Sequence, residues 1–370
     1  MKVIYISLFV IFWAQMAKSQ IPANDPAWHL QTGSSEEFNS SLDFTNKWYN
    51  QYPFGPLNNG AEYNYPANLI QTGTTLKIRV DTLVPSVHHS PSVYADPDYL
   101  GVTYVYQGGA IWSRSKDYHF GYLEISAKFP TSYYPYWPAF WLWSKDCSAQ
   151  PPYTDEIDIA ENGAYNSENG YMVGTNYHLH IPGTDCYGPN HSTSDGETVD
   201  VPFLLSSGFH KYAVGWWPDR LIWYIDDTPV RTIFDPTGAS IPQHAMAVIL
   251  NFAIDPWYAY LPSDWNDDAI TPHGNYSPTF LPQYFEIDYL RYYKLDTDCS
   301  NDITICTPSS DYSSRALVRS ISTGGGCSTT FNTSDSYVLR ATDYVLLDVG
   351  TTINTDGSGY FAIDVTACPE

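Results

Sequence analysis

The chain has 370 residues, of which 15% are charged and 16% are aromatic. Lys and Arg total 17 against 40 Asp and Glu, so the formal net charge is -23. A field of this sign repels nucleic acid, anionic lipid and sulfated polysaccharide. Composition therefore argues against a nucleic-acid partner and favours an uncharged substrate.

Residues 1–19 have the pattern of a secretory signal peptide. Lys2 precedes an apolar run over 3–14, and small residues stand before Gln20. That run is too short to span a bilayer comfortably, and no later apolar run approaches the roughly 20 residues of a membrane helix. We expect cleavage after Ser19 and a secreted, extracellular or surface-associated protein without membrane insertion. A buried N-terminal helix and an uncleaved anchor are the alternatives.

Residue usage and periodicity predict an all-β protein with few helices. The chain holds 32 Tyr, 12 Trp and 27 Pro; Tyr and Trp favour strands, and Pro with Gly marks turns. We expect one large β-sandwich over residues 20–298 and a small β-rich domain over 299–370. The strands read from the sequence are 75–80, 121–129, 136–143, 156–161, 172–180, 211–216, 221–225, 246–253 and 284–293.

Aromatic residues recur in the predicted strand 136–143. A strand alternates faces with period two, so Trp137, Trp141 and Trp143 share one face while Phe140 and Leu142 lie opposite. Aromatic rings stack on the apolar faces of sugars, which favours a binding groove. A strand buried on both faces in a sandwich core is the alternative.

Three acids crowd the predicted strand 156–161, which reads Glu-Ile-Asp-Ile-Ala-Glu. Glu156 and Asp158 share a face, and Glu161 joins them only if a β-bulge near Ala160 adds one residue. Paired carboxyls on one wall serve retaining glycosidases as nucleophile and as general acid and base. Crowding keeps one of them protonated near neutral pH. A solvated acidic strand face is the alternative.

The next predicted strand, 172–180, carries Asn176, His178 and His180 on one face. These side chains can hydrogen-bond a substrate or steady a catalytic carboxylate. Two histidines at this spacing are also compatible with a metal site, but no further ligand set of suitable spacing is evident. A structural histidine is the remaining alternative.

A series of short motifs extends over residues 28–294. They are Glu36-Glu37-Phe38-Asn39, Leu42-Asp43, Lys47-Trp48, Asn68 before Gly73 and Leu76, Gly121-Tyr122-Leu123-Glu124, 137–141, 156–161, Phe209-His210-Lys211-Tyr212, Trp216, Pro218-Asp219-Arg220, Trp223-Tyr224-Ile225-Asp226 and 287–293. In this order they resemble glycoside hydrolase family 16, in its laminarinase-like branch with a bulged catalytic strand.

The resemblance implies a β-jelly roll of two curved antiparallel sheets whose concave face forms a glycan cleft. It implies Glu156 as nucleophile, Asp158 as assisting acid and Glu161 as general acid and base, with no cofactor for catalysis. It also implies a structural calcium at Asp288 and main-chain oxygens near Glu37; an ordinary surface aspartate is the alternative. The substrate-binding candidates are Asn68, Trp112, Trp137, Trp141, His178 and Trp257.

Function is expected to be endo-hydrolysis of a β-linked polysaccharide by a monomer. β-1,3-Glucan of the laminarin type is favoured, and an algal galactan of the agarose, porphyran or carrageenan type is the alternative. A sulfated galactan ranks lower because sulfate requires a cluster of basic residues. A glycan-binding protein without hydrolysis, or an adhesin, belongs to a different class; retention of all three acids argues against it.

Six cysteines are even in number and form no C-x-x-C pair, so disulfides are expected rather than zinc. Cys147 and Cys186 flank the catalytic strand and can pair or stay free. Beyond residue 298, a loose stretch over 307–323 is expected, and then short strands at 337–339, 344–347 and 360–363, bracketed by Cys327 and Cys368. This tail resembles a small β-module of secreted Bacteroidetes-type proteins, with a role in secretion, spacing or attachment. Carbohydrate binding is the rival role, although the tail lacks Trp.

Overall fold

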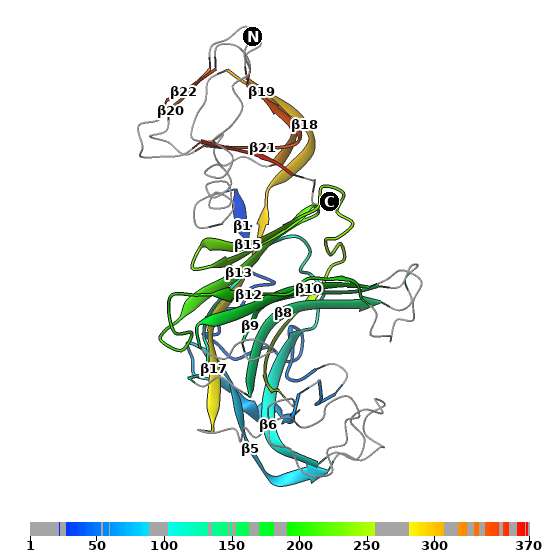
Figure 1. Ribbon diagram of the computed structural model, residues 1–370, viewed down its shortest axis with the longest axis vertical. Helices are drawn as coiled ribbons and strands as arrows, with labels where there is room; N and C mark the ends of the chain where they lie inside the picture. Colours follow the sequence, from blue (N-terminus) through cyan, green and yellow to red (C-terminus); the bar gives the residue numbers. More distant parts are fainter. Residues whose placement is uncertain are drawn as a thin grey trace.

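The computed structural model describes a chain that is almost entirely β (Figure 1). A 3-10 turn, η2 (Pro66–Asn68), lies among the strands. Among the described residues no helix has the length and apolarity needed to cross a membrane. The structure describes residues 22, 27–52, 55–58, 60–88, 103–131, 135–146, 149, 153–162, 170–180, 191–255, 281–306, 317–323, 329–332, 337–347, 351–354, 361–366 and 368.

One antiparallel sheet, which we call the outer sheet, forms one of the two layers of the large domain. Its strands lie in the order β4, β5, β17, β7, β13, β14 and β15, and β1 pairs with the end of β17. The bounds are β1 Trp28–Leu30, β4 Leu69–Gln71, β5 Leu76–His88, β7 Gly121–Lys128, β13 His210–Trp217, β14 Arg220–Ile225, β15 Thr228–Phe234 and β17 Gln283–Leu295.

The second antiparallel sheet carries the catalytic strand. Its order is β6, β16, β8, β9 and β10, with β11 and β12 both pairing with β10. β2 and β3 pair with β6, and β5 also reaches β6, so the two sheets join at one edge. The bounds are β2 Trp48–Tyr49, β3 Glu62–Asn64, β6 Thr103–Ser113, β8 Tyr136–Asp146, β9 Tyr153–Glu161, β10 Met172–His180, β11 His191–Ser194, β12 Glu197–Asp200 and β16 Ala247–Ile254.

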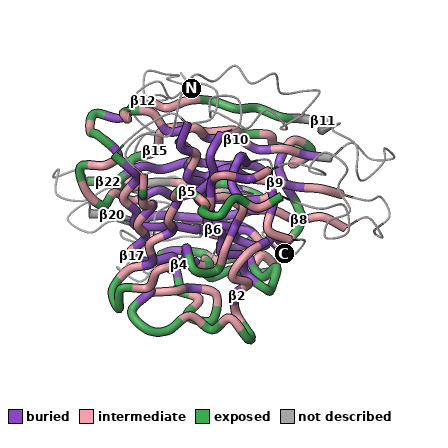
Figure 2. Tube along the Cα trace, turned by 90° about the horizontal axis from the view of Figure 1, so that it is seen from below, coloured by how far each residue is buried: buried purple, intermediate pink, exposed green. Residues whose placement is uncertain are grey.

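The predicted jelly-roll sandwich is confirmed, and each strand read from the sequence coincides with an observed one. Between the sheets lies an apolar core that includes Phe140 and Leu142 of β8 and Ile157 of β9, all at most 1% exposed. Figure 2 shows the buried residues concentrated in the stacked strands at the centre of the molecule. Burial of such side chains contributes about 1.5–3 kcal/mol each. It also fixes which face of β8 and β9 is turned outward.

Residues beyond 296 form a smaller β unit at one end of the molecule (Figure 1). Its four-stranded sheet, β18-β19-β21-β23, is parallel throughout, and β20 and β22 form a second parallel pair. Parallel neighbours cannot be joined by tight hairpins, so the chain coils around a core that includes Ile305, Phe331 and Leu339. The bounds are β18 Thr297–Ile305, β19 Leu317–Thr323, β20 Thr330–Asn332, β21 Tyr337–Leu346, β22 Thr352–Asn354 and β23 Phe361–Val365.

The expectation of a loose stretch over 307–323 is wrong for its last part. Leu317–Thr323 is strand β19, because Leu317, Val318 and Ile321 are buried in the unit. A disulfide joins Cys299 to Cys368, and Cys306 is also disulfide-bonded. The suggested pairing of Cys147 with Cys186 lies outside the described residues, as does Cys327.

Buried charges connect this unit, which we call the C-terminal module, to strand β14. Arg220 forms a two-pronged pair with Asp219, at 2.9 and 2.8 Å, and donates from Nη2 to the main-chain oxygen of Val365 at 2.9 Å. Its Nη1 lies 3.4 Å from Asp364, while the hydroxyl of Thr366 donates to Asp219 at 3.1 Å. All five residues except Val365 are more than 90% buried. Removing one partner of such a buried ionic group is strongly destabilising.

A buried carboxyl in β3 makes the stability of the fold depend on pH. Glu62 is 1% exposed and accepts a hydrogen bond from Ile254 N at 2.7 Å. Burial raises the pKa of Glu62 from 4.5 to about 8. The unfolded chain ionises this group near pH 4.5 while the folded protein retains the proton, so the free energy of unfolding falls as pH rises from about 4.5 to about 8.

Glu62→Gln is expected to remove this pH dependence, since an amide keeps the shape and the acceptor without ionising. The wild type should lose up to roughly 4 kcal/mol relative to the variant across the window. Urea unfolding of both proteins at pH 5, 6.5 and 8 measures the difference. Parallel pH profiles for the two proteins would show that Glu62 is ionised in the folded state.

Candidate active site

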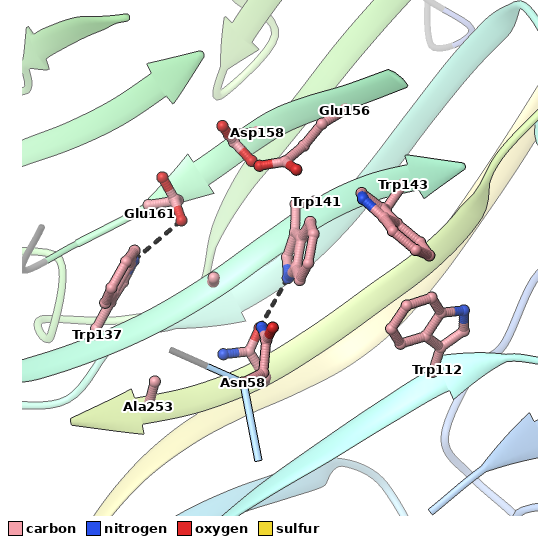
Figure 3. A pocket seen from close by; sticks show the side chains of 11 residues that line it. Asn58, Trp112, Trp137, Trp141, Trp143, Glu156, Asp158, Glu161 and Ala253 are labelled. Atoms are coloured by element: carbon pink, nitrogen blue, oxygen red, sulfur yellow. Dashed lines mark hydrogen bonds between the residues drawn. The ribbon is translucent and has the colours of Figure 1, made fainter. Parts of the chain in front are cut away.

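A β-bulge in β9 brings the three acids to one wall, as the spacing predicts. Ala160 pairs with Phe140 and Asp158 with Trp141, so Ile159 is the extra residue on the β8 side. The register with β10 shifts at the same point. A strand without the bulge would turn the last acid toward the core. Figure 3 shows all three carboxyls above the tryptophans of β8.

The cleft beside these acids has an aromatic floor. Trp137, Trp141 and Trp143 are half-buried on the outward face of β8, and the alternative of a strand buried on both faces is wrong. Trp112 of β6 lies edge-on to Trp143, with ring centroids 5.3 Å apart, and is itself buried. The cleft is lined by Asn58, Trp112, Trp137, Ala139, Trp141, Trp143, Glu156, Asp158, Glu161, Asn251 and Ala253.

Indole N–H groups of the floor donate to polar groups of the cleft. Trp137 donates to Glu161 Oε1 at 3.0 Å (Figure 3), and Trp141 donates to Asn251 Oδ1 at 2.8 Å. The first bond fixes the carboxyl of Glu161 over the floor. The second locks the ring of Trp141, so that the floor is preorganised before a ligand enters.

Proton affinity is raised at both glutamates. Burial, followed by the negative charges of Asp158 and Glu161, raises the pKa of Glu156 well above its ordinary value. Burial and the charge of Asp158 likewise raise the pKa of Glu161, against the opposing hydrogen bond from Trp137. Glu156 and Glu161 therefore retain protons that isolated glutamates would lose. A proton donor is therefore available near neutral pH.

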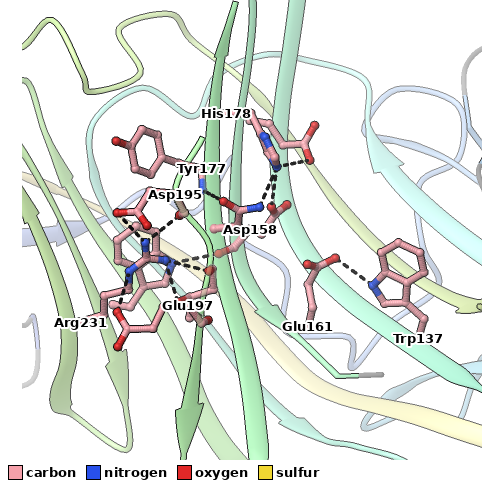
Figure 4. Close-up of polar contacts among 12 residues, drawn as sticks. Trp137, Asp158, Glu161, Tyr177, His178, Asp195, Glu197 and Arg231 are labelled. Carbon is pink, nitrogen blue, oxygen red and sulfur yellow. Dashed lines mark hydrogen bonds and ion pairs between the residues drawn. The ribbon is translucent and has the colours of Figure 1, made fainter. Parts of the chain in front are cut away.

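His178 lies against the acids rather than among the side chains that line the cleft (Figure 4). Its Nε2 is 3.6 Å from Asp158 Oδ2 and 3.9 Å from Glu156 Oε1. Asn176 accepts from Tyr177 N at 2.8 Å, which orients its amide to donate to Nε2 of His178 at 2.8 Å. That arrangement places the ring proton on Nδ1. His178 therefore packs against Asp158 and Glu156 without donating a proton to them from Nε2, and it is not among the residues that line the cleft.

Glu156, Asp158 and His178 also form a group with metal-ligating atoms within 4.8 Å of one another. A cation held there would occupy the carboxylates that the chemistry requires.

The structure separates the other predicted binding residues. Trp112, Trp137 and Trp141 line the cleft. Asn68 does not: it is fully buried and donates to Gly108 O at 2.7 Å, while its Oδ1 accepts from Arg79 at 2.9 Å. The prediction of Asn68 as a substrate ligand is wrong, because the short turn η2 directs its side chain into the core. Trp257 lies outside the described residues.

A structural calcium at Asp288 and main-chain oxygens near Glu37 remains a prediction. The carboxylate of Glu37 is held by Nε and Nη2 of Arg291, each at 2.8 Å, and this cation lowers its pKa. The main-chain oxygen of neighbouring Glu36 already accepts from Leu290 N. Among the described residues, Asp288 and Glu37 belong to no cluster of three metal-ligating side chains. Arg291 therefore already neutralises the carboxylate of Glu37.

Three residues that line the cleft, Trp143, Asn251 and Asn58, were not among the predicted substrate-binding residues. The sequence did indicate a cleft position for Trp143, because it shares a strand face with Trp137 and Trp141. Asn251 lies opposite Ala139 in the pairing of β16 with β8, a register that no local pattern reveals. Asn58 stands outside the regular strands, where periodicity gives no information.

A cluster of carboxyls on a bulged strand, facing a cleft lined by tryptophan, is typical of a glycoside hydrolase. The family model of glycosyl hydrolases family 16 matches residues 60–269, and the chain belongs to this family. The β-glucanase of Rhodothermus marinus is 26% identical over 304 residues, which cover 78% of this chain and 92% of that protein.

Solved structures of family relatives agree with the fold. The κ-carrageenase of Pseudoalteromonas carrageenovora, in complex with an oligosaccharide, has a TM-score of 0.57 at 22% identity and covers 72% of this chain and 94% of its own. The laminarinase catalytic domain of Thermotoga petrophila has a TM-score of 0.51 at 22% identity, covering 72% and 98%. At these identities the likeness supports the jelly roll alone.

Proposed function

We propose that this protein is a retaining endo-hydrolase of a neutral β-glucan, with β-1,3-linked laminarin-type chains as the substrate. One observation carries the proposal: no lysine or arginine lines the described part of the cleft, whose floor is tryptophan. Sulfate groups require cationic partners. A neutral glucan needs apolar ring faces and hydrogen-bonding groups, and Trp141, Trp143 and Asn251 supply both.

The proposed mechanism has two steps. In the first, the carboxylate of Glu156 attacks the anomeric carbon while Glu161 gives its proton to the glycosidic oxygen, so the C–O bond breaks and a glycosyl ester forms. In the second, Glu161 takes a proton from water, whose oxygen attacks the same carbon and releases Glu156. The configuration is retained because two inversions occur.

Asp158 and His178 prepare Glu156 for attack. A proton shared in a hydrogen bond with Asp158 contributes to the raised pKa of Glu156. Attack requires that proton on Asp158, which then donates to Glu156 and restrains its orientation. His178, with Nε2 as an acceptor from Asn176, leaves this proton in place and packs the pair from the β10 side.

We also propose secretion. Support comes from the signal-peptide pattern of residues 1–19 and from the disulfide between Cys299 and Cys368, a bond typical of oxidising compartments. The mature protein is proposed to act as a monomer on polysaccharide outside the cell. Analysis of the N-terminus of the exported protein tests the cleavage point.

Product analysis on laminarin, lichenan, agarose and κ-carrageenan tests the substrate. We expect oligosaccharides from laminarin, slower release from lichenan and no release from κ-carrageenan. Efficient cleavage of agarose would replace the glucan assignment with a galactan one. Binding of laminarin without new reducing ends would instead indicate a glycan-binding protein, and NMR of the first product distinguishes retention from inversion.

A further inference from the structure

The bulge in β9 leaves main-chain groups that the regular ladder does not satisfy. On the β10 side, Glu161 pairs with Gly174 and Asp158 with Asn176, so Thr175 faces two residues of β9 rather than one. Interruption of the ladder at a bulge leaves local backbone groups in need of other partners. Two of the carbonyl groups concerned are those of Asp158 and Thr175, and both accept hydrogen bonds from side chains of the outer sheet.

Trp223 of β14 hydrogen-bonds the first of these carbonyls, that of Asp158. It is 1% exposed, and its indole N–H donates to Asp158 O at 2.9 Å from across the sandwich. This is a bond to the backbone of the catalytic strand itself, at the residue from which the bulge begins. The indole has a single donor, so its N–H is committed to this bond.

Arg231 of β15 hydrogen-bonds the second carbonyl, that of Thr175 (Figure 4). Its Nη1 donates to Thr175 O at 2.7 Å and to Thr175 Oγ1 at 3.0 Å. Its guanidinium carbon lies 4.7 Å from the centre of the Trp223 ring. The cation is fixed from its other side by Asp195 and Glu197, whose carboxylates lie 3.3 and 3.4 Å away. Trp223 and Arg231 therefore form one packed unit beneath the bulge.

We infer that Trp223 and Arg231 are positioning residues that hold the bulged register, and thereby keep Glu161 on the same wall as Glu156. This rests on the proposed function, in which both glutamates act on one glycosidic bond. Neither residue reaches the substrate; their effect passes through the backbone of β9 and β10. Loss of the donors favours regular pairing, which turns Glu161 away from the cleft.

Trp223→Phe tests the inference, with Trp216→Phe as its matched control. Trp216 of β13 is 2% exposed, and its indole N–H donates to the main-chain oxygen of Pro242 at 2.8 Å rather than to β9. The two variants lose the same chemical group from equally buried sites. The readouts are kcat, KM and the pH profile of kcat/KM on laminarin, or on whichever glycan the wild type cleaves.

Trp223→Phe should lower kcat by about 10- to 100-fold with little change in KM, since small misplacement of a catalytic group has an effect of this size. In the pH profile of kcat/KM of Trp223→Phe, the limb assigned to Glu161 should move to a different pH. Trp216→Phe should keep the kcat and the pH profile of the wild type. Hydrogen exchange of the amides of 156–162 should quicken in Trp223→Phe alone. Equal kcat and equal profiles in the two variants would overturn the inference.

Arg231→Lys keeps the test decisive if Trp223→Phe does not fold. A lysine preserves the charge but cannot donate to the main-chain oxygens of Thr175 and Asp195 together. The same fall in kcat, at temperatures where the variant is fully folded, supports the inference, and wild-type kcat contradicts it. A wild type inactive on every glycan would instead refute the proposed function, so the two failures are distinguishable.

Discussion

Replacing Glu156 with Gln is expected to lower kcat on laminarin by about three to five orders of magnitude, as for loss of a covalent nucleophile. The amide keeps the shape of the cleft but cannot form the glycosyl ester. KM should change little, because Trp141 and Trp143 still bind the sugar. Release of reducing ends, followed over hours at high enzyme concentration, measures the residual rate.

Glu286→Gln is the matched control for this prediction. It makes the same substitution on β17 of the outer sheet, where Glu286 pairs with Lys77 at 2.8 Å. Its activity should equal that of the wild type. Appreciable turnover by Glu156→Gln, beyond the trace expected from deamidation, would remove Glu156 from the role of nucleophile.

Replacing Glu161 with Ala is expected to lower kcat on polysaccharide by about 10³-fold or more, since both protonation of the leaving oxygen and activation of water are lost. An aryl glycoside with a good leaving group needs no proton, so its first step should persist and the glycosyl-enzyme should accumulate. Mass spectrometry of the intact protein detects that ester.

Azide added to Glu161→Ala should restore turnover, because it fills the vacated space and attacks without a general base. The glycosyl azide should keep the configuration of the substrate, since Glu156 still forms the intermediate. A product of inverted configuration would mean that Glu161 is the nucleophile and that the two roles must be exchanged.

The local sequence pattern was sufficient to predict side-chain direction in strands that have one buried face and one face open to the cleft. The alternation in β8 separated its cleft tryptophans from Phe140 and Leu142, and the spacing of acids in β9 required the bulge that the register shows. In both strands a period of two, and one departure from it, carry the information. Side chains on such strands have only two directions to choose from.

Residues outside that periodicity were placed less well. Asn68 belongs to a 3-10 turn whose direction depends on Gly108 and Arg79, both distant in sequence. The pairing of Glu37 with Arg291 depends on contact between the first and last parts of the domain. The coiled parallel pairing of the C-terminal module was also missed, because short strands look alike whether their neighbours run parallel or antiparallel.

The junction at Arg220 fixes the orientation of the C-terminal module relative to the large domain. Because buried charges and hydrogen bonds tie Asp364, Val365 and Thr366 to strand β14, the cleft and the module turn together as one body. A flexible stalk would let the cleft sample every direction around its point of attachment. Here the junction instead fixes the direction in which the tryptophan floor faces relative to the module.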